Sequence, residues 1–158
     1  MARVELLGGA LVESVFDGCD ALEELYIGPG VTKISYGVFT DFDSLRRVVV
    51  DSAAEVSFQS CGGLETAEIK SPVVGRFAFS YCTNLTSAVL GEGVGEIGDY
   101  AFDECRRLEE IVIPTSVTYI GDSAFYGCSG LTSVTIPEGV KNIGASTFRR
   151  CSGPLLFG

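Results

Sequence analysis

The sequence of 158 residues contains no histidine and no tryptophan, and it has only one methionine and five prolines. Without histidine, the Ser-His-Asp and Cys-His nucleophile systems and most zinc and iron sites are excluded. The sequence also lacks a run of about 20 uninterrupted apolar residues, the length that a transmembrane helix requires. We therefore expect no catalytic residues, no metal site, no cofactor and no membrane insertion.

Basic residues are scarce as well. The chain has 11 lysines and arginines against 21 aspartates and glutamates, which gives a formal net charge of -10. A protein of this charge repels a phosphate backbone, so nucleic acid is not expected as a partner. The first residues carry a single arginine and a short apolar stretch bounded by Glu5 and Glu13, which is a poor match to a signal peptide.

An internal repeat is the most informative feature that the sequence does contain. Phe102, Phe125 and Phe148 stand 23 residues apart, and a cysteine follows each of them after three residues. Earlier in the chain, the phenylalanine column continues through Phe16, Phe39, Phe58 and Phe79. The next column holds all six cysteines and, once, Phe42: Cys19, Cys61, Cys82, Cys105, Cys128 and Cys151. Self-similarity at such a period predicts a solenoid of stacked coils.

Each repeat predicts a coil that is mainly β-structure. Residues 108–113 alternate toward their end and are rich in β-branched side chains, which predicts a half-buried strand that Pro114 closes. Residues 117–120 predict a second short strand, which Gly121 ends. Residues 122–128 are too few for a stable helix alone but predict one helical turn, which directs the phenylalanine and cysteine of the repeat inward.

The column geometry indicates reduced cysteines. Residues of one column in neighbouring coils lie about 4.8 Å apart, but their Cα–Cβ bonds run parallel and do not face each other. A straight ladder also cannot bring four sulfurs to one tetrahedral point, as zinc requires. We expect buried thiols that pack as small hydrophobes.

The period shortens in one region of the chain. Phe39 and Phe58 are 19 residues apart, and Phe58 and Phe79 are 21 residues apart. The strand segments there are intact, so the missing residues belong to the back of the coil. Two interpretations stay open, a local change of curvature and a notch that receives a partner.

Residues 113–137 read Ile-Pro-x-x-Val-Thr-x-Ile-Gly-x-x-Ala-Phe-x-x-Cys-x-x-Leu-x-x-Val-x-Ile-Pro. This unit resembles the BspA-type leucine-rich repeat, and the resemblance covers nearly the whole chain. It implies a right-handed solenoid with a curved parallel sheet, and a non-enzymatic role in adhesion or protein binding. We expect residues 1–158 to form a single leucine-rich repeat domain of about six to seven repeats, with incomplete units at both ends.

The resemblance also bears on location. Members of the family are typically surface or secreted proteins of bacteria and microbial eukaryotes. The sequence itself shows no signal peptide, which implies the cytoplasm if the chain is complete.

The exposed positions of the sheet strands are the candidate partner-binding residues. The central column consists of Tyr26, Val49, Glu68, Val89, Val112 and Thr135. Its neighbour consists of Glu24, Arg47, Thr66, Ser87, Glu110 and Ser133. Solenoids commonly bind ligands on this face, although valine and threonine are also frequent in strands that bind nothing.

Two patterns that suggest an enzyme or a cofactor binder do not fit the repeat. Glu24 and Glu110 lie four coils apart, roughly 19 Å, and Glu68 lies about 10 Å from each, beyond the roughly 5–9.5 Å of a glycosidase pair. Residues 93–98 match G-x-G-x-x-G, but the repeat predicts no helix after them to hold a pyrophosphate.

Three hypotheses follow from the sequence. The first is a non-enzymatic module that binds a protein ligand through the sheet face. The alternative is a structural scaffold segment that associates with itself by stacking through uncapped ends. An enzyme or cofactor binder is the third, and it would need polar groups that converge in a closed pocket.

Overall fold

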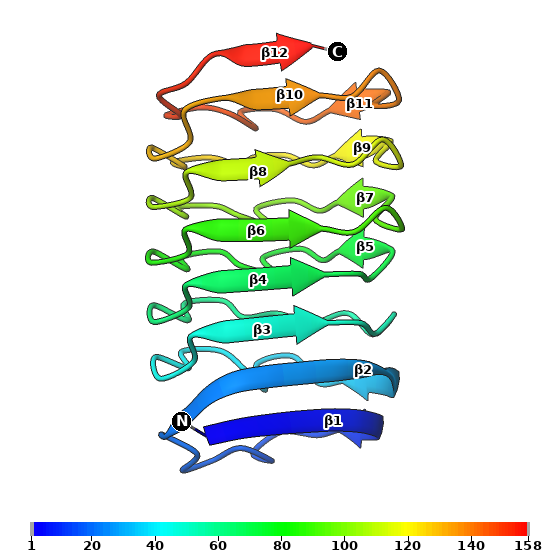
Figure 1. Ribbon diagram of the computed structural model, residues 1–158, viewed down its shortest axis with the longest axis vertical. Coiled ribbons are helices and arrows are strands. Elements are labelled where there is room, and N and C mark those ends of the chain that lie inside the picture. The colour runs from blue at the N-terminus through cyan, green and yellow to red at the C-terminus, as the bar shows by residue number, and fades with distance from the viewer. Residues whose placement is uncertain (1, 158) are drawn as a thin grey trace.

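Short parallel strands stack one above another along the front of the molecule (Figure 1). In the computed structural model, which describes residues 2–157, these strands form a six-stranded sheet of order β1-β2-β3-β4-β6-β8. Their bounds are Ala2–Leu11 (β1), Leu22–Ile34 (β2), Arg47–Val50 (β3), Thr66–Ile69 (β4), Ser87–Leu90 (β6) and Glu110–Val112 (β8). The chain coils in a right-handed sense from one strand to the next, as predicted, and makes a solenoid of about 6 turns (Figure 1).

A second parallel sheet lies behind the first (Figure 1). It has the order β11-β9-β7-β5 and is built from two-residue strands. Their bounds are Val73–Val74 (β5), Glu96–Ile97 (β7), Tyr119–Ile120 (β9) and Asn142–Ile143 (β11). The predicted second strand of the repeat is therefore confirmed in these coils. The two remaining strands, β10 (Val134–Ile136) and β12 (Leu155–Phe157), pair with each other in parallel.

Stacked phenylalanine rings form the spine of the core. Phe102 lies between Phe79 and Phe125, with ring centroids 5.3 and 5.2 Å apart. Leucines from successive coils form a second fully buried column: Leu45, Leu64, Leu85 and Leu108. Each coil buries too few apolar groups to be stable alone, so the stacking of coils supplies most of the stability.

The cysteines form a third column and are free, as predicted. Cys61, Cys82, Cys105 and Cys128 are buried, and Cys151 is half-buried. From Cys61 onward, each thiol donates to the carbonyl oxygen of the phenylalanine on the preceding coil, over 2.8 to 3.2 Å. Burial raises the pKa of the Cys61 thiol to about 12. Cys19 departs from the prediction and is exposed, because among residues 2–157 no coil lies beneath it.

The predicted helical turn is wrong, because no helix is found within residues 2–157. Between residues 122 and 128, Tyr126 and Cys128 donate to carbonyls three residues back, whereas Phe125 and Gly127 donate to carbonyls of the next coil. Every second amide is therefore used for bonds between coils and is lost to a helical ladder. Ser123 adds to this effect, because its φ of 53° lies in the left-handed region.

The shortened coil coincides with a hollow in the back surface. Residues 51–57 form no strand, so the second sheet does not continue below β5. A hollow of about 390 Å³ opens there, lined in part by Tyr36, Val56, Arg76 and Phe77. The interpretation of this region as a partner notch stays a prediction.

Candidate binding face and cleft

The structure brings ten of the twelve predicted face residues into two registered rows. In each row, every residue is in register with the next one on the neighbouring strand. One row consists of Glu24, Arg47, Thr66, Ser87 and Glu110, and the other consists of Tyr26, Val49, Glu68, Val89 and Val112. The residues between the rows point inward and are buried: Leu25, Val48, Ala67, Ala88 and Ile111. The alternation that the sequence predicted for these strands is thus confirmed, although their role in binding stays a prediction.

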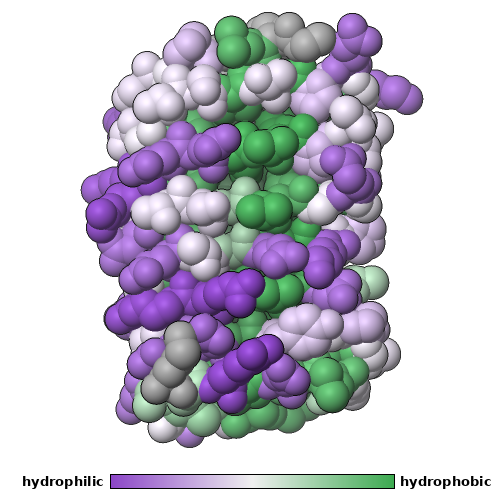
Figure 2. All heavy atoms as spheres, in the orientation of Figure 1, coloured by the Kyte–Doolittle hydropathy of each residue, from purple (hydrophilic) through white to green (hydrophobic). Residues whose placement is uncertain are grey.

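Val89 and Val112 form the most exposed apolar part of this face. Their relative exposures are 56% and 67%. Figure 2 shows hydrophobic residues along the middle of the front surface at the height of β6 and β8, with hydrophilic residues beside them. Tyr26, at the other end of the row, donates to Asp51 over 3.3 Å, and its pKa is raised by desolvation and by that carboxylate.

Ser133 and Thr135 lie outside this sheet. Strand β10, which begins one residue after Ser133 and contains Thr135, pairs with β12 and forms no strand pairing with β8. The predicted columns are therefore interrupted between the fifth and sixth residues of each row. The interruption is a gap between two adjacent coils, where backbone hydrogen bonds of the front sheet are missing.

The ladder at the start of the sheet strands weakens progressively toward this gap. The amide one residue after each column leucine donates to the equivalent carbonyl of the preceding coil. The donor–acceptor distances are 2.8 Å for Arg46 to Glu23, 2.9 Å for Glu65 to Arg46, 3.0 Å for Thr86 to Glu65 and 3.3 Å for Glu109 to Thr86. The next bond in the series, from Thr132 to Glu109, is not formed.

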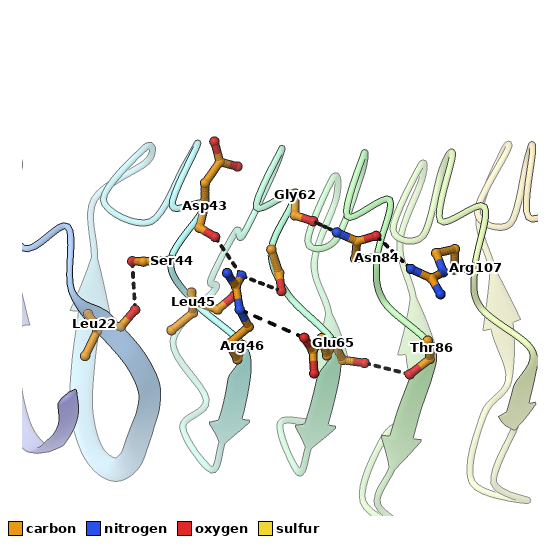
Figure 3. A network of polar contacts seen from close by, with 11 residues as sticks. Leu22, Asp43, Ser44, Leu45, Arg46, Gly62, Glu65, Asn84, Thr86 and Arg107 are labelled. Atoms are coloured by element: carbon orange, nitrogen blue, oxygen red, sulfur yellow. Dashed lines mark hydrogen bonds and ion pairs between the residues drawn. The ribbon is translucent and has the colours of Figure 1, made fainter. Parts of the chain in front are cut away.

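A series of side-chain bridges between the coils ends at the same place, where the remaining contact, from the Ser129 hydroxyl to the Arg106 carbonyl, is long at 3.5 Å. Figure 3 shows these bridges along the starts of the strands. Asn84 donates to the Gly62 carbonyl over 2.7 Å, and Arg107 donates to the Asn84 side chain over 3.3 Å. The equivalent position in the next coil is Gly130, which has no side chain to continue the series.

Two prolines remove the bonds at the other end of the strands. Lys70 donates to the Val50 carbonyl and Gly91 donates to the Ile69 carbonyl, both over 2.8 Å. The next two coils carry Pro114 and Pro137 at this position, and proline has no amide hydrogen to donate. The strand pair β6–β8 therefore loses one ladder bond, and β8–β10 loses the equivalent bond as well.

The back of the solenoid stays closed at the same level. Gly121 donates to the Ile97 carbonyl and Gly144 donates to the Ile120 carbonyl, each over 2.8 Å. The rings of Phe125 and Phe148 also keep the regular spacing of 5.3 Å. The two coils thus separate only on the side of the front sheet, which makes the gap wedge-shaped.

The wedge is a surface cleft of about 650 Å³, a volume typical of small-ligand and side-chain sites. We refer to it as the β8–β10 cleft. It is lined by Glu110, Ile111, Val112, Ile113, Thr115, Ser133, Thr135, Pro137, Glu138 and Gly139. Four predicted face residues are among these, whereas Ile113, Pro137 and Glu138 were not predicted. The replacement of Lys70 and Gly91 by two prolines was the one signal in the sequence that marks the place.

The charges on the face are unevenly distributed. Glu68 lies 3.8 Å from Arg47 and 3.3 Å from Lys70, so the middle of the face is neutralised by ion pairs. Glu110 and Glu138, at the cleft, take part in none of the ion pairs described for residues 2–157. The cleft therefore carries two carboxylates that no lysine or arginine among the described residues neutralises.

The sequence matches the BspA type leucine rich repeat region in six copies, over residues 10–65 and 52–154. The chain belongs to this family. Its repeat, its parallel sheets and its solenoid are those of the family, and the family and its fold are generally non-enzymatic. No curated protein matches the chain.

Solved bacterial proteins share the fold. A leucine-rich repeat protein from Bacteroides ovatus is 27% identical over 83% of this BspA-type chain, with a TM-score of 0.74. A leucine rich cell surface protein from Faecalibacterium prausnitzii is 26% identical over 99% of the chain, with a TM-score of 0.70. The T. pallidum leucine-rich repeat protein is 29% identical over 82%, with a TM-score of 0.58. The chain spans 35%, 43% and 55% of these three proteins, respectively.

Leucine-rich repeat proteins of this kind typically bind proteins. Among the described residues, no helix has the length and hydropathy that a membrane span requires.

Proposed function

We propose that this chain is a protein-binding module that recognises its ligand through the front sheet, with Val89, Val112 and the β8–β10 cleft at the centre of the contact. The observation that carries the proposal is the pairing of two well-exposed valines with an adjacent cleft on a single face. Apolar side chains that remain exposed next to a concave site are typical of recognition surfaces.

Adhesion at a cell surface is the biological setting that we propose for this binding. The support is the membership of the BspA-type family and the likeness to a protein described as a leucine rich cell surface protein. The rigid spine of stacked phenylalanines suits such a role, because it holds the rows of face residues in fixed register.

The test is capture of proteins on a defined array by the wild-type chain and by face variants. Val89→Glu and Val112→Glu should abolish capture, because each places a charge in the apolar centre of the face. Val73→Glu is the matched control, since Val73 is 46% exposed on the back sheet. The proposal is contradicted if the back variant loses capture equally, or if the wild-type chain captures nothing.

A further inference from the structure

We propose that the β8–β10 cleft binds an extended peptide segment of the protein ligand and takes a lysine or arginine side chain of that segment. The inference rests on the proposed function and specifies the chemistry of the contact. It follows from three properties of the cleft: free backbone groups, an apolar floor and uncompensated acidic residues.

The first property is the interrupted ladder. Just beside the cleft lining, in an adjoining hollow, the carbonyl of Glu109 and the amide of Thr132 do not bond to each other, although their equivalents do in the preceding pairs of strands. Pro137 also leaves the carbonyl of Ile113 without the donor that Lys70 and Gly91 provide in earlier coils. An extended peptide carries alternating amides and carbonyls, so it can pair with strand groups that a neighbouring strand has left free.

The second property is the apolar floor. Val112 is 67% exposed at the cleft, and Ile111 and Ile113 line it from below with only 4% and 6% exposure. Pro137 closes the opposite wall. The aliphatic stem of a lysine or arginine buries well against such a surface while its charged end reaches the rim.

The third property is the charge. Glu110 and Glu138 line the cleft and have no ion-pair partner among residues 2–157. The nearby arginines are engaged elsewhere, since Arg106 pairs with Glu104 over 2.7 Å and Arg107 donates to Asn84. A cation from the ligand would complete the electrostatics of the cleft, whereas an anionic segment would be repelled.

The experiment uses three synthetic peptides that differ at one position. The first is acetyl-Thr-Val-Thr-Lys-Thr-Val-Thr-amide, and the other two carry norleucine or glutamate in place of the lysine. Each is titrated into the ¹⁵N-labelled full chain, and amide chemical shifts give both the affinity and the place of binding. The lysine peptide should shift residues 110–113 and 133–138, with an affinity at least roughly tenfold above that of the norleucine peptide. The glutamate peptide should not bind.

Variants of the two cleft glutamates test which carboxylates bind the lysine side chain of the peptide. Glu110→Gln and Glu138→Gln should each weaken the lysine peptide by roughly tenfold and leave the norleucine peptide unchanged. Glu96→Gln is the control, because Glu96 is an exposed glutamate of strand β7 in the back sheet, outside the binding face. It should alter neither affinity. All three positions are exposed, so circular dichroism should show an unchanged fold.

Several results would overturn the proposal: equal affinity for the three peptides, shifts confined to β2–β4, preference for glutamate, or no binding at all. Any of these, together with loss of protein capture in Val112→Glu, would remove the cleft proposal and leave the proposed function standing. If the lysine peptide binds at the cleft while Val89→Glu and Val112→Glu still capture proteins normally, the proposed function fails instead.

Discussion

The Sγ atom of Cys105 lies 3.1 Å from the carbonyl oxygen of Phe79 on the preceding coil. The same contact recurs between Cys128 and Phe102, also at 3.1 Å. A thiol at this position fills the volume of a small apolar side chain and also donates weakly to a buried carbonyl. The recurrence explains why the repeat uses cysteine here without forming disulfides.

Replacement of a buried thiol should destabilise the solenoid. Cys105→Ala removes the sulfur and its donor while the Phe79 carbonyl stays buried, so we expect a loss of roughly 1–3 kcal/mol in the free energy of unfolding. Chemical denaturation followed by circular dichroism measures it. Cys19→Ala is the control, because Cys19 is exposed and should change stability by less than about 0.5 kcal/mol. Equal losses in the two variants would contradict the role assigned to the column.

The free energy of unfolding should fall as the pH rises from 9.0, the ordinary pKa of a thiol, to about 12. Burial raises the pKa of Cys61 from 9.0 to about 12, so the folded chain keeps a proton that the unfolded chain releases. Between these values the folded state binds more protons, and raising the pH therefore favours unfolding. Denaturation midpoints measured across the window should decline, and Cys61→Ala should reduce the slope. A slope that is the same in the variant would contradict this assignment.

The phenylalanine spine should show a dependence on position. Phe102 is fully buried between two stacked rings, so Phe102→Ala should cost about 3–5 kcal/mol. Phe148 is half-buried and stacks on Phe125 alone among the described residues, so Phe148→Ala should cost clearly less. Thermal unfolding of the two variants checks the order. A larger loss of stability in Phe148→Ala than in Phe102→Ala would show that the stacked rings do not stabilise the core in the way described.

The period of the sequence predicts most of the fold because each column repeats one environment. Phe102 and Cys105 could be placed in the core from their spacing, and Val112 could be placed on the open face from the alternation in its strand. The helical turn could not be judged from spacing, since i and i+3 positions point inward equally well in the turn that is found. The helix does not form because alternate amides bond to the next coil. A prediction made from one repeat at a time does not take that coil into account.

The cleft was hidden from sequence reasoning for a related reason. Residues 108–114 and 131–137 both read as a leucine, a strand and a proline, so they predict two ordinary neighbours in one sheet. The opening depends on backbone bonds that are missing between coils, because Pro114 and Pro137 have no amide hydrogen to donate. Their combined effect appears only when the coils are stacked.

Restoring a donor should narrow the cleft. Pro137→Ala supplies an amide opposite the Ile113 carbonyl, equivalent to the amides of Lys70 and Gly91. We expect slower hydrogen exchange at residues 132–137 and weaker binding of the lysine peptide by several-fold. Pro154→Ala is a suitable control, because Pro154 is exposed and lies outside the cleft lining. Unchanged exchange in the Pro137 variant would show that proline is not the cause of the opening.

Scalar couplings across backbone hydrogen bonds, detected by NMR, report directly whether the front sheet is open between β8 and β10. We predict couplings from the Thr86 amide to the Glu65 carbonyl and from the Lys141 amide to the Thr118 carbonyl, whose donor–acceptor distances are 3.0 and 2.9 Å. No coupling should be found between the Thr132 amide and the Glu109 carbonyl. A coupling there, of the same size as the other two, would show a closed sheet and contradict the account.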